Sequence, residues 1–272
     1  MMMTGLTSEL ARPRGRYGVD GDYRLIPAPV VFGGYLLMCL AAGVLAGMWL
    51  MAGRIVPGVG AAVVTAVLVG AGMSIVRFSR RGKFEVWAQL LTRLGLRGDE
   101  RVLDLGCGRG AVLLTAAKLV PRGCAVGVDI WRADQTGNSI EATLANADAE
   151  GVADRIEVHT ADMTDLRLPD GSFDLVVSSL AIHNLPGRQA RLSAIDEAIR
   201  VLRPGGRVVI ADLGFTRLYA TRLRERGMVA VKRDDLGWRA WWGLPLLRTH
   251  AVSATKPQSR GPGNLDGEAG KS

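Results

Sequence analysis

Two long apolar runs near the N-terminus are the most uniform pattern along this chain. Residues 30–52 and 55–76 contain no charged side chain, and each run is longer than the roughly 18–20 apolar residues that a helix needs to cross a bilayer. A helix that is apolar on every face has no polar side to turn toward water. The pattern therefore predicts a transmembrane helical hairpin over residues 30–77, turned by a short loop at residues 53–58.

From about residue 100 onward, short apolar runs alternate with helical stretches. The apolar runs predict strands at Val102–Leu105, Ala125–Ile130, Ile156–Met163, Phe173–Ser179 and Leu202–Ala211. The remaining stretches predict helices, one of them ahead of the first strand, at Phe84–Leu94, Ala111–Leu119, Ile140–Glu150 and Gln189–Leu202. Strands alternating with helices at this spacing indicate a doubly wound α/β domain.

The first of these strands leads into a glycine-rich turn, residues 106–110, which opens the next helix. Glycines let the backbone turn tightly and approach a ligand without a Cβ clash, and a helix N-terminus offers free N–H groups to a carboxylate or phosphate. The glycine spacing fits the dinucleotide fingerprint poorly. Asp104 precedes the turn, and Asp129 ends the following strand, where a carboxylate can accept hydrogen bonds from ribose hydroxyls.

Five segments together resemble class I S-adenosylmethionine-dependent methyltransferases, and they occur in the order and spacing of that family. They read DLGCGRG at 104–110, GVDI at 127–130, ADM at 161–163, FDLVVSS at 173–179 and LRPGGRVVIAD at 202–212. The resemblance covers residues from about 84 to 257. It implies a seven-stranded Rossmann-like sheet whose antiparallel last strand lies at His250–Thr255, and it implies S-adenosyl-L-methionine as the cofactor.

At the methionine end of the cofactor, the resemblance implies that Asp104 holds the amino group. It also implies that Gly106, Gly108 and Gly110 let the loop wrap around the methionine moiety. Ser178, on the segment that reaches the methyl-donor site in this family, is a further expected cofactor-binding residue. Asp104 has an alternative, purely structural interpretation as a residue that caps the turn.

At the nucleoside end, the resemblance implies that Asp129 binds the ribose diol and that Ile130 lies against the adenine. Asp162 would accept a hydrogen bond from the adenine amino group, while the Met163 amide would cap a ring nitrogen. Asp162 could instead only cap the loop that follows it. In the polar loop after Asp129, Trp131 or Gln135 could lie at the mouth of the pocket.

The acceptor is less determined than the cofactor. The segment of residues 178–185 lacks the Asn/Asp-Pro-Pro-aromatic pattern of methyltransferases that act on amino nitrogens, which counts against methylation of nucleic-acid amines. His183 in this segment is the candidate catalytic base, because an imidazole titrates near the working pH. The alternative is a helix-starting histidine that is hydrogen-bonded to a loop carbonyl.

Arginine and lysine placement predicts the orientation of the hairpin. Four arginines precede the first apolar run and four basic residues follow the second, but only Arg54 lies between them. By the positive-inside bias, both ends face the cytoplasm. We therefore expect a multi-pass protein of the cell (inner/plasma) membrane with a cytoplasmic N-terminal segment at 1–29, the hairpin at 30–77, a cytoplasmic methyltransferase domain at 78–256 and a disordered tail at 257–272.

Composition and residue spacing limit the kinds of binding partner that we expect. The formal charge of +8 is concentrated beside the apolar runs, which favours anionic headgroups over nucleic acid. The three cysteines are too scattered for a metal site or a disulfide framework. Gly43 and Gly47 have the spacing of a close helix contact, which fits either a homodimer face or an ordinary glycine-rich membrane helix. The tryptophan-rich segment 236–245 could lie at the headgroup level or could cover the sheet edge.

These patterns lead to one main functional hypothesis. It is a membrane-anchored methyltransferase that transfers a methyl group from S-adenosylmethionine to a small or lipophilic, lipid-like acceptor. One alternative is a non-catalytic, membrane-bound protein that binds the cofactor or acts as a scaffold. The other is a membrane-associated RNA methyltransferase. The sequence leaves open whether O, N, C or S accepts the methyl group.

Overall fold

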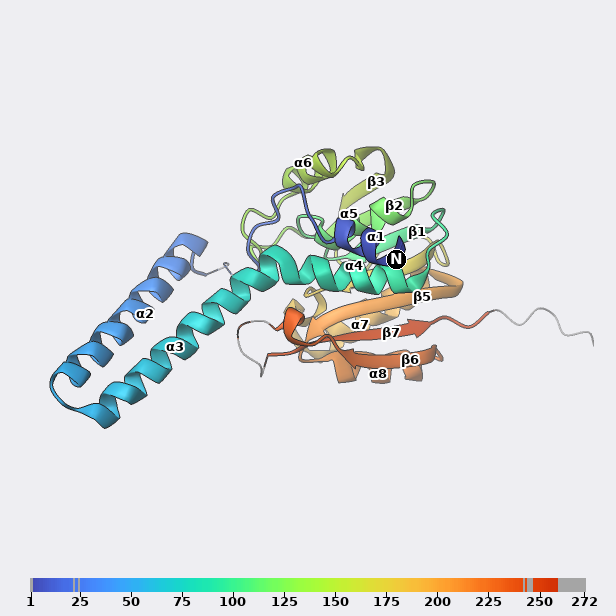
Figure 1. The fold of residues 1–272 in the computed structure, drawn as a ribbon. Helices are drawn as coiled ribbons and strands as arrows, with labels where there is room; N and C mark the ends of the chain where they lie inside the picture. The colour runs from blue at the N-terminus through green and yellow to red at the C-terminus, as the bar shows by residue number, and fades with distance from the viewer. Residues whose placement is uncertain (1, 22, 24, 242, 244–246, 259–272) are drawn as a thin grey trace, which may run out of the picture.

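The computed structural model describes residues 2–21, 23, 25–241, 243 and 247–258. In it a helical hairpin projects from one side of an α/β domain (Figure 1). The predicted tail lies outside the described residues from residue 259 onward, as does Trp242 of the tryptophan-rich segment.

The hairpin consists of α2 (Ala28–Met51) and α3 (Ile55–Arg77). Their apolar windows have mean hydropathies of 2.1 and 2.2, and only 6% and 0% of the residues in these windows are buried. The helices are therefore long and apolar enough to cross a membrane, and neither is a core helix of the α/β domain. A Cβ on Gly43 would contact Thr65 of α3, whereas Gly47 faces open space.

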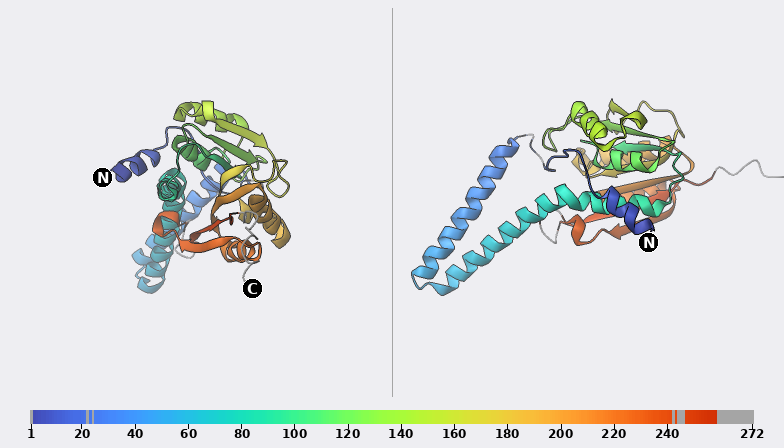
Figure 2. Two further views of the ribbon diagram at one scale, coloured as in Figure 1. Left: turned by 90° about the vertical axis from the view of Figure 1, so that its right-hand side faces the viewer. Right: turned by 45° about the horizontal axis from the view of Figure 1, so that its top comes forward.

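The second hairpin helix continues into the domain without a break. A π-helical turn, η1 (Phe78–Gly82), joins α3 to α4 (Lys83–Leu94). Figure 2 shows the helical ribbon running on from the hairpin into the domain. A Cβ on Gly82 would lie 2.2 Å from the carbonyl oxygen of Arg239, so only glycine allows this helix to pack against η4 (Trp238–Ala240). The predicted helix Phe84–Leu94 is confirmed, and it ends at Gly95 in the left-handed conformation.

The sheet has seven strands in the order β3-β2-β1-β4-β5-β7-β6. The strands are β1 (Arg101–Leu105), β2 (Cys124–Asp129), β3 (Ile156–Thr160), β4 (Phe173–Ser179), β5 (Leu202–Leu213), β6 (Val229–Asp235) and β7 (Thr249–Thr255). β7 is antiparallel to both β5 and β6, and β1 to β5 pair in parallel. The predicted doubly wound sheet with an antiparallel seventh strand is confirmed.

Helices cover both faces of this sheet because its parallel strands are apolar on both sides. One core contains side chains of α4, α5 (Ala111–Leu119) and α6 (Ile140–Glu150). The other contains side chains of α7 (Gly187–Val201) and α8 (Thr216–Glu225). The short 3-10 helices η2 (Ala153–Arg155) and η3 (Ile182–Asn184) lie in the connections.

Two expectations need correction. The helix expected at 189–202 begins at Gly187 and ends at Val201, because Leu202 is already extended and pairs with Phe173 in the sheet. For the N-terminal segment, residues 1–29, no packing against the α/β domain was expected. Its helix α1 (Met2–Leu10) packs beside α4, and the residues after α1 lie against the α/β domain (Figure 1).

Candidate active site

A pocket opens beside the carboxyl ends of β1 and β4, where the strand order reverses, the usual ligand position in an open α/β sheet. Between its walls it encloses about 870 Å³, including its open mouth. Most of the residues predicted to bind the cofactor line this one pocket: Asp104, Gly106, Gly108, Asp129, Ile130, Asp162 and Met163.

The glycine-rich turn is shaped by positive backbone angles. Gly106, Gly108 and Gly110 have φ values of +73°, +51° and +85°, a region that side-chain-bearing residues rarely adopt. A Cβ on Gly106 would also lie 2.3 Å from the Cβ of Ala181. Gly110 does not line the pocket, and it acts by starting α5.

Asp104 is the least satisfied polar group of the pocket. Its residue is 1% exposed, and neither carboxylate oxygen has a hydrogen-bond partner among the described residues. Burial raises the pKa of Asp104 to about 8. The charge of Asp129 acts in the same direction, and the amide of Leu113 opposes it without reaching hydrogen-bond geometry. A buried, unpaired carboxylate is costly unless a cation comes to it, and the ammonium of a bound methionine moiety is such a cation.

Asp129 holds the glycine turn and the following loop together. Its Oδ2 accepts from the Gly108 amide at 2.8 Å, and its Oδ1 accepts from the Trp131 amide at 2.7 Å. Each oxygen keeps a further lone pair for a ribose hydroxyl. Trp131 has a φ of 56°, and its indole donates to Thr160 Oγ1 at 2.7 Å, so its side chain lies on β3. Of the two proposed mouth residues, Gln135 lines the pocket and Trp131 does not.

The adenine side of the pocket is formed by Ile130, Asp162 and Met163. Asp162 Oδ1 accepts from both the amide and the hydroxyl of Thr164 at 2.8 Å. The turn-capping role of Asp162 is therefore present, alongside its place on the pocket wall. The roles of these three residues toward the cofactor stay predictions.

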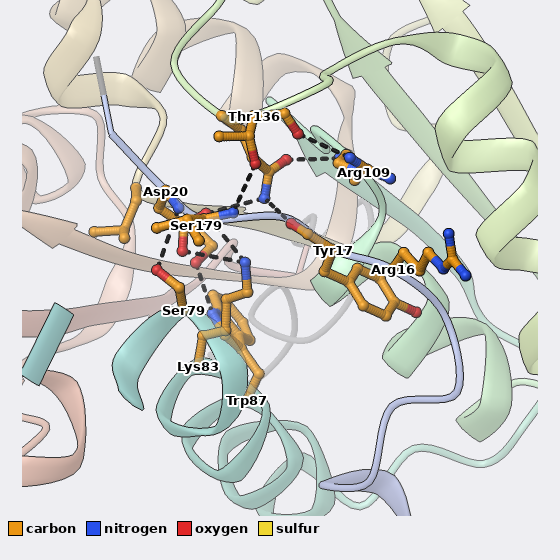
Figure 3. Close-up of polar contacts among 12 residues, drawn as sticks. Arg16, Tyr17, Asp20, Ser79, Lys83, Trp87, Arg109, Thr136 and Ser179 are labelled. Carbon is orange, nitrogen blue, oxygen red and sulfur yellow. Dashed lines mark hydrogen bonds and ion pairs between the residues drawn. The ribbon is translucent and has the colours of Figure 1, made fainter. Parts of the chain in front are cut away.

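Ser178 is misplaced as a binding residue. It is fully buried, and its hydroxyl donates to the carbonyl oxygen of Leu105 at 2.8 Å inside the sheet. Side chains alternate along a strand, so the next residue, Ser179, reaches the pocket instead. Ser179 Oγ accepts from Trp87 Nε1 of α4 at 2.9 Å (Figure 3).

His183 lies in η3, next to pocket residues but not among them. Its Nδ1 is 2.5 Å from Asp212 Oδ1, and its amide donates to Asp212 Oδ2 at 2.9 Å. Asp212 is fully buried at the end of β5 and also accepts from Tyr219 Oη. His183 Nε2 has no partner among the described residues. This arrangement matches a histidine base held by a buried carboxylate, and sequence reasoning did not assign Asp212.

Asp134 connects this histidine with the pocket. Burial, followed by the charge of Asp129, raises the pKa of Asp134 to about 6, and the charge of His183 opposes the shift. Asp134 lines the pocket and lies 3.5 Å from Asn184 Nδ2, which belongs to the same short helix as His183. His183 is therefore within electrostatic reach of the pocket.

The N-terminal segment contributes a wall that sequence reasoning missed. Asp20 lines the pocket and forms an ion pair with Lys83, the first residue of α4. Gln135 Nε2 donates both to the Tyr17 carbonyl at 2.9 Å and to Asp20 Oδ1 at 3.0 Å. Figure 3 labels Tyr17 and Asp20, the two acceptors. The Asp20 amide in turn donates to Ser79 Oγ of η1 at 3.2 Å.

The same segment is fixed farther back by Glu150 at the end of α6. Glu150 Oε1 accepts from the amides of Arg14 and Gly15 and from Tyr17 Oη at 2.7–3.0 Å. Its other oxygen forms a 2.6 Å ion pair with Lys118. We call residues 14–20 the N-terminal strap.

No group of three or more His, Cys, Asp or Glu side chains within the described ranges could hold a metal ion.

Residues 102–206 match a protein family described as a methyltransferase domain. The chain is 34% identical over 157 residues to 27-O-demethylrifamycin SV methyltransferase of Amycolatopsis mediterranei, covering 54% of each chain. It is 32% identical over 133 residues to demethylmenaquinone methyltransferase of Symbiobacterium thermophilum, covering 48% of this chain and 50% of that one. The chain thus spans about half the length of these curated relatives.

Among solved structures, geranyl diphosphate C-methyltransferase of Streptomyces coelicolor superposes with a TM-score of 0.52 at 16% identity. The superposition covers 66% of this chain and 82% of that one, which supports the fold. The family match and the curated relatives show an S-adenosylmethionine-dependent methyltransferase domain over the matched residues, with S-adenosylmethionine as its cofactor. The orphaned Asp104 and the glycine cradle fit that cofactor.

Proposed function

Starting from a methyltransferase domain joined to two apolar helices, we propose that this chain is a membrane-anchored enzyme that methylates a small or lipophilic acceptor. One observation carries the proposal. The pocket that contains Asp104 and Asp129 is also lined by Asp20 and Lys83, which lie just before α2 and just after α3 and η1. An acceptor that approaches from a bilayer around the hairpin would meet the cofactor pocket at the hairpin base.

The surface around the hairpin base supports membrane attachment. A groove beside the end of α3 is lined by Trp238, by the acidic Glu85 and by five arginines. The arginines are Arg12, Arg77, Arg80, Arg81 and Arg239. The guanidinium groups of Arg77 and Arg239 lie 4.5 and 5.0 Å from the Trp238 ring centroid. Tryptophan and arginine next to an apolar helix suit the headgroup layer. We therefore keep the cytoplasmic, multi-pass orientation as part of the proposal.

The segment directly after β4 gives the pocket three apolar lining residues, Leu180, Ala181 and Leu185, together with Asn184. Leu180 adopts a φ of 51°, a strained conformation for a leucine, and its amide donates to the Ala211 carbonyl at 2.9 Å. Strain of this kind persists where the surroundings hold it, often at binding sites. The wall it forms suits an acceptor with hydrocarbon character.

Bound S-adenosylmethionine supplies a methyl group already activated on a sulfonium, so the protein contributes mainly positioning and exclusion of water. Asp104 would hold the ammonium end, and the glycine turn would hold the methionine moiety. Asp212 holds His183 through Nδ1 and leaves Nε2 to take a proton from the acceptor. This arrangement favours an acceptor that loses a proton, such as a hydroxyl group or an acidic carbon.

A turnover experiment with the full chain tests the proposal. Full-length protein in detergent or nanodiscs is incubated with methyl-labelled S-adenosylmethionine and a membrane lipid extract. We expect label in the organic-extractable fraction. His183→Ala and Asp212→Asn should lower the rate about 10²- to 10⁴-fold, the usual contribution of a general base. His159→Ala, on β3 with its side chain 52% exposed, is the matched control and should retain activity.

Different results refute different parts of the proposal. Label that appears only in water-soluble products contradicts a lipophilic acceptor. Salt-sensitive labelling of RNA supports the nucleic-acid alternative instead. Cofactor binding without any turnover on lipid, small-molecule or RNA pools supports a non-catalytic protein. Full activity of His183→Ala refutes the role of His183 as the catalytic base but leaves the methyltransferase assignment unaffected.

A further inference from the structure

Lys83 is a buried lysine on the wall of the cofactor pocket. It is 5% exposed, and its Nζ lies 3.0 and 3.1 Å from Asp20 Oδ1 and Oδ2. An ammonium group has three N–H donors, and the two Asp20 oxygens account for two of them. Among the described residues no other acceptor is present for the third. A pocket-lining lysine therefore has one donor left for a ligand.

Two side chains connect Lys83 with the glycine turn. Asp20 Oδ1 also accepts from Gln135 Nε2 at 3.0 Å, and Gln135 Oε1 accepts from the Arg109 amide at 3.1 Å. The same Gln135 oxygen would lie 2.8 Å from a Cβ on Gly108. Figure 3 shows Asp20, Lys83 and Arg109 around this bridge. Lys83 thus belongs to the side of the pocket where the turn receives the methionine moiety.

The methionine moiety carries two opposite charges, and the pocket offers a separate partner for each. Asp104 is the unpaired acid for its ammonium group. Among the described residues, the basic side chains that line the pocket are Lys83 and Arg132. Arg132 lies three residues after Asp129, the residue predicted to bind the ribose.

We propose that Lys83 binds the carboxylate of the methionine moiety and that Asp20 positions the lysine for it. This inference rests on the cofactor assignment of the domain. Lys83 follows α3 after the five residues of η1, and Asp20 lies shortly before α2. Both ends of the hairpin therefore meet in one ion pair, and the hairpin base completes the cofactor site.

Calorimetry on the full-length chain, with two ligands, tests the proposal. S-adenosylmethionine and its decarboxylated analogue differ only in the carboxylate. We expect the unmodified protein to prefer S-adenosylmethionine about 10- to 100-fold, which corresponds to a hydrogen bond to a charged group. In Lys83→Met this ratio should fall to about one, with little change in affinity for the analogue. Lys83→Arg keeps the charge and should retain part of the preference.

Two matched variants separate the proposed role from a structural one. Arg132→Met removes the other basic side chain of the pocket and should leave the ratio unchanged. Asp20→Asn keeps the lysine charge but removes the carboxylate that positions it, so it should reduce the preference without abolishing it. Thermal unfolding of each variant verifies that it is folded.

Three results would overturn the inference. If Lys83→Met weakens both ligands equally, the ion pair is only structural, and the cofactor assignment still stands. If Arg132→Met is the variant that abolishes the preference, Arg132 binds the carboxylate. If the unmodified protein binds neither ligand, the cofactor assignment itself fails, and this inference fails with it.

Discussion

Replacing Asp104 by asparagine tests the chemistry of the pocket most directly. In the empty protein, burial holds the pKa of Asp104 at about 8, against an ordinary value of 3.8. The folded state therefore binds one more proton than the unfolded chain between these two values. Stability must then fall as pH rises through this window. A rise from 3.8 to about 8 corresponds to about 5–6 kcal/mol, an upper limit because water in the pocket screens the charge.

Asp104→Asn stays neutral and isosteric, so it removes this cost at high pH. We expect the cofactor-free variant to unfold at a higher temperature than the unmodified protein at pH 8.5, and the difference to shrink toward pH 5.5. Cofactor affinity should fall by about 1.5–3 kcal/mol, because the ammonium loses a charged partner. Asp148→Asn, an exposed acid on α6, is the control and should change neither quantity.

Calorimetry then measures the proton itself. At pH 6.5 the cofactor ammonium is already protonated, while Asp104 is still neutral in the empty pocket. Binding of the ammonium favours the carboxylate, so close to one proton should leave the protein. Titrations in two buffers of different ionisation enthalpy detect this proton, and Asp104→Asn should release none. Binding by the unmodified protein without proton release would show that Asp104 is ionised when empty, which refutes the reasoning.

Two further predictions concern the hairpin and the N-terminal strap. In a background without native cysteines, a cysteine beside Arg54 should react with an impermeant maleimide in intact cells. A cysteine at the exposed Arg81 should react only after lysis, and the reverse pattern contradicts the orientation. Burial opposes ionisation of Glu150, but bonds from Lys118, Tyr17 and the strap amides outweigh it and hold its pKa below the ordinary value. Glu150→Gln should therefore lower stability at pH 7 by about 1.5–3 kcal/mol and speed proteolysis of the strap. The stability difference should be lost as pH falls from the ordinary glutamate value of 4.5 through the lowered pKa of Glu150 in the folded protein. Unchanged proteolysis refutes this role.

Features encoded by neighbouring residues were predictable. The strands follow from local apolar runs in the sequence. The glycine turn follows from glycines that adopt positive φ. Most predicted binding residues share one pocket for the same reason, since the carboxyl ends of parallel strands meet at one sheet edge. The prediction of Ser178 as a binding residue missed by one position, because strand alternation places neighbours on opposite faces and Ser179 lines the pocket.

The N-terminal strap could not be predicted from its own residues. It has no apolar periodicity, and its structure depends on partners more than 110 positions away: Asn146, Glu150, Gln135 and Thr136. Asp212 was missed for a related reason. It ends the recognised segment 202–212, but only the fold shows that its carboxylate reaches His183. Long-range pairing of polar side chains leaves no periodic signal in the sequence.

The ion pair between Asp20 and Lys83 stabilises the fold less than its burial suggests. Desolvation of two charges offsets much of their attraction, so a buried pair adds little net stability, while removing one partner leaves a costly unpaired charge. Such a pair makes two segments depend on each other. Here the segments are the chain entering the hairpin and the chain leaving it. A shift of the hairpin that separated the two segments would leave an unpaired charge in the pocket. If Lys83 binds the cofactor as proposed, the position of the hairpin and the affinity for the cofactor are coupled at this contact.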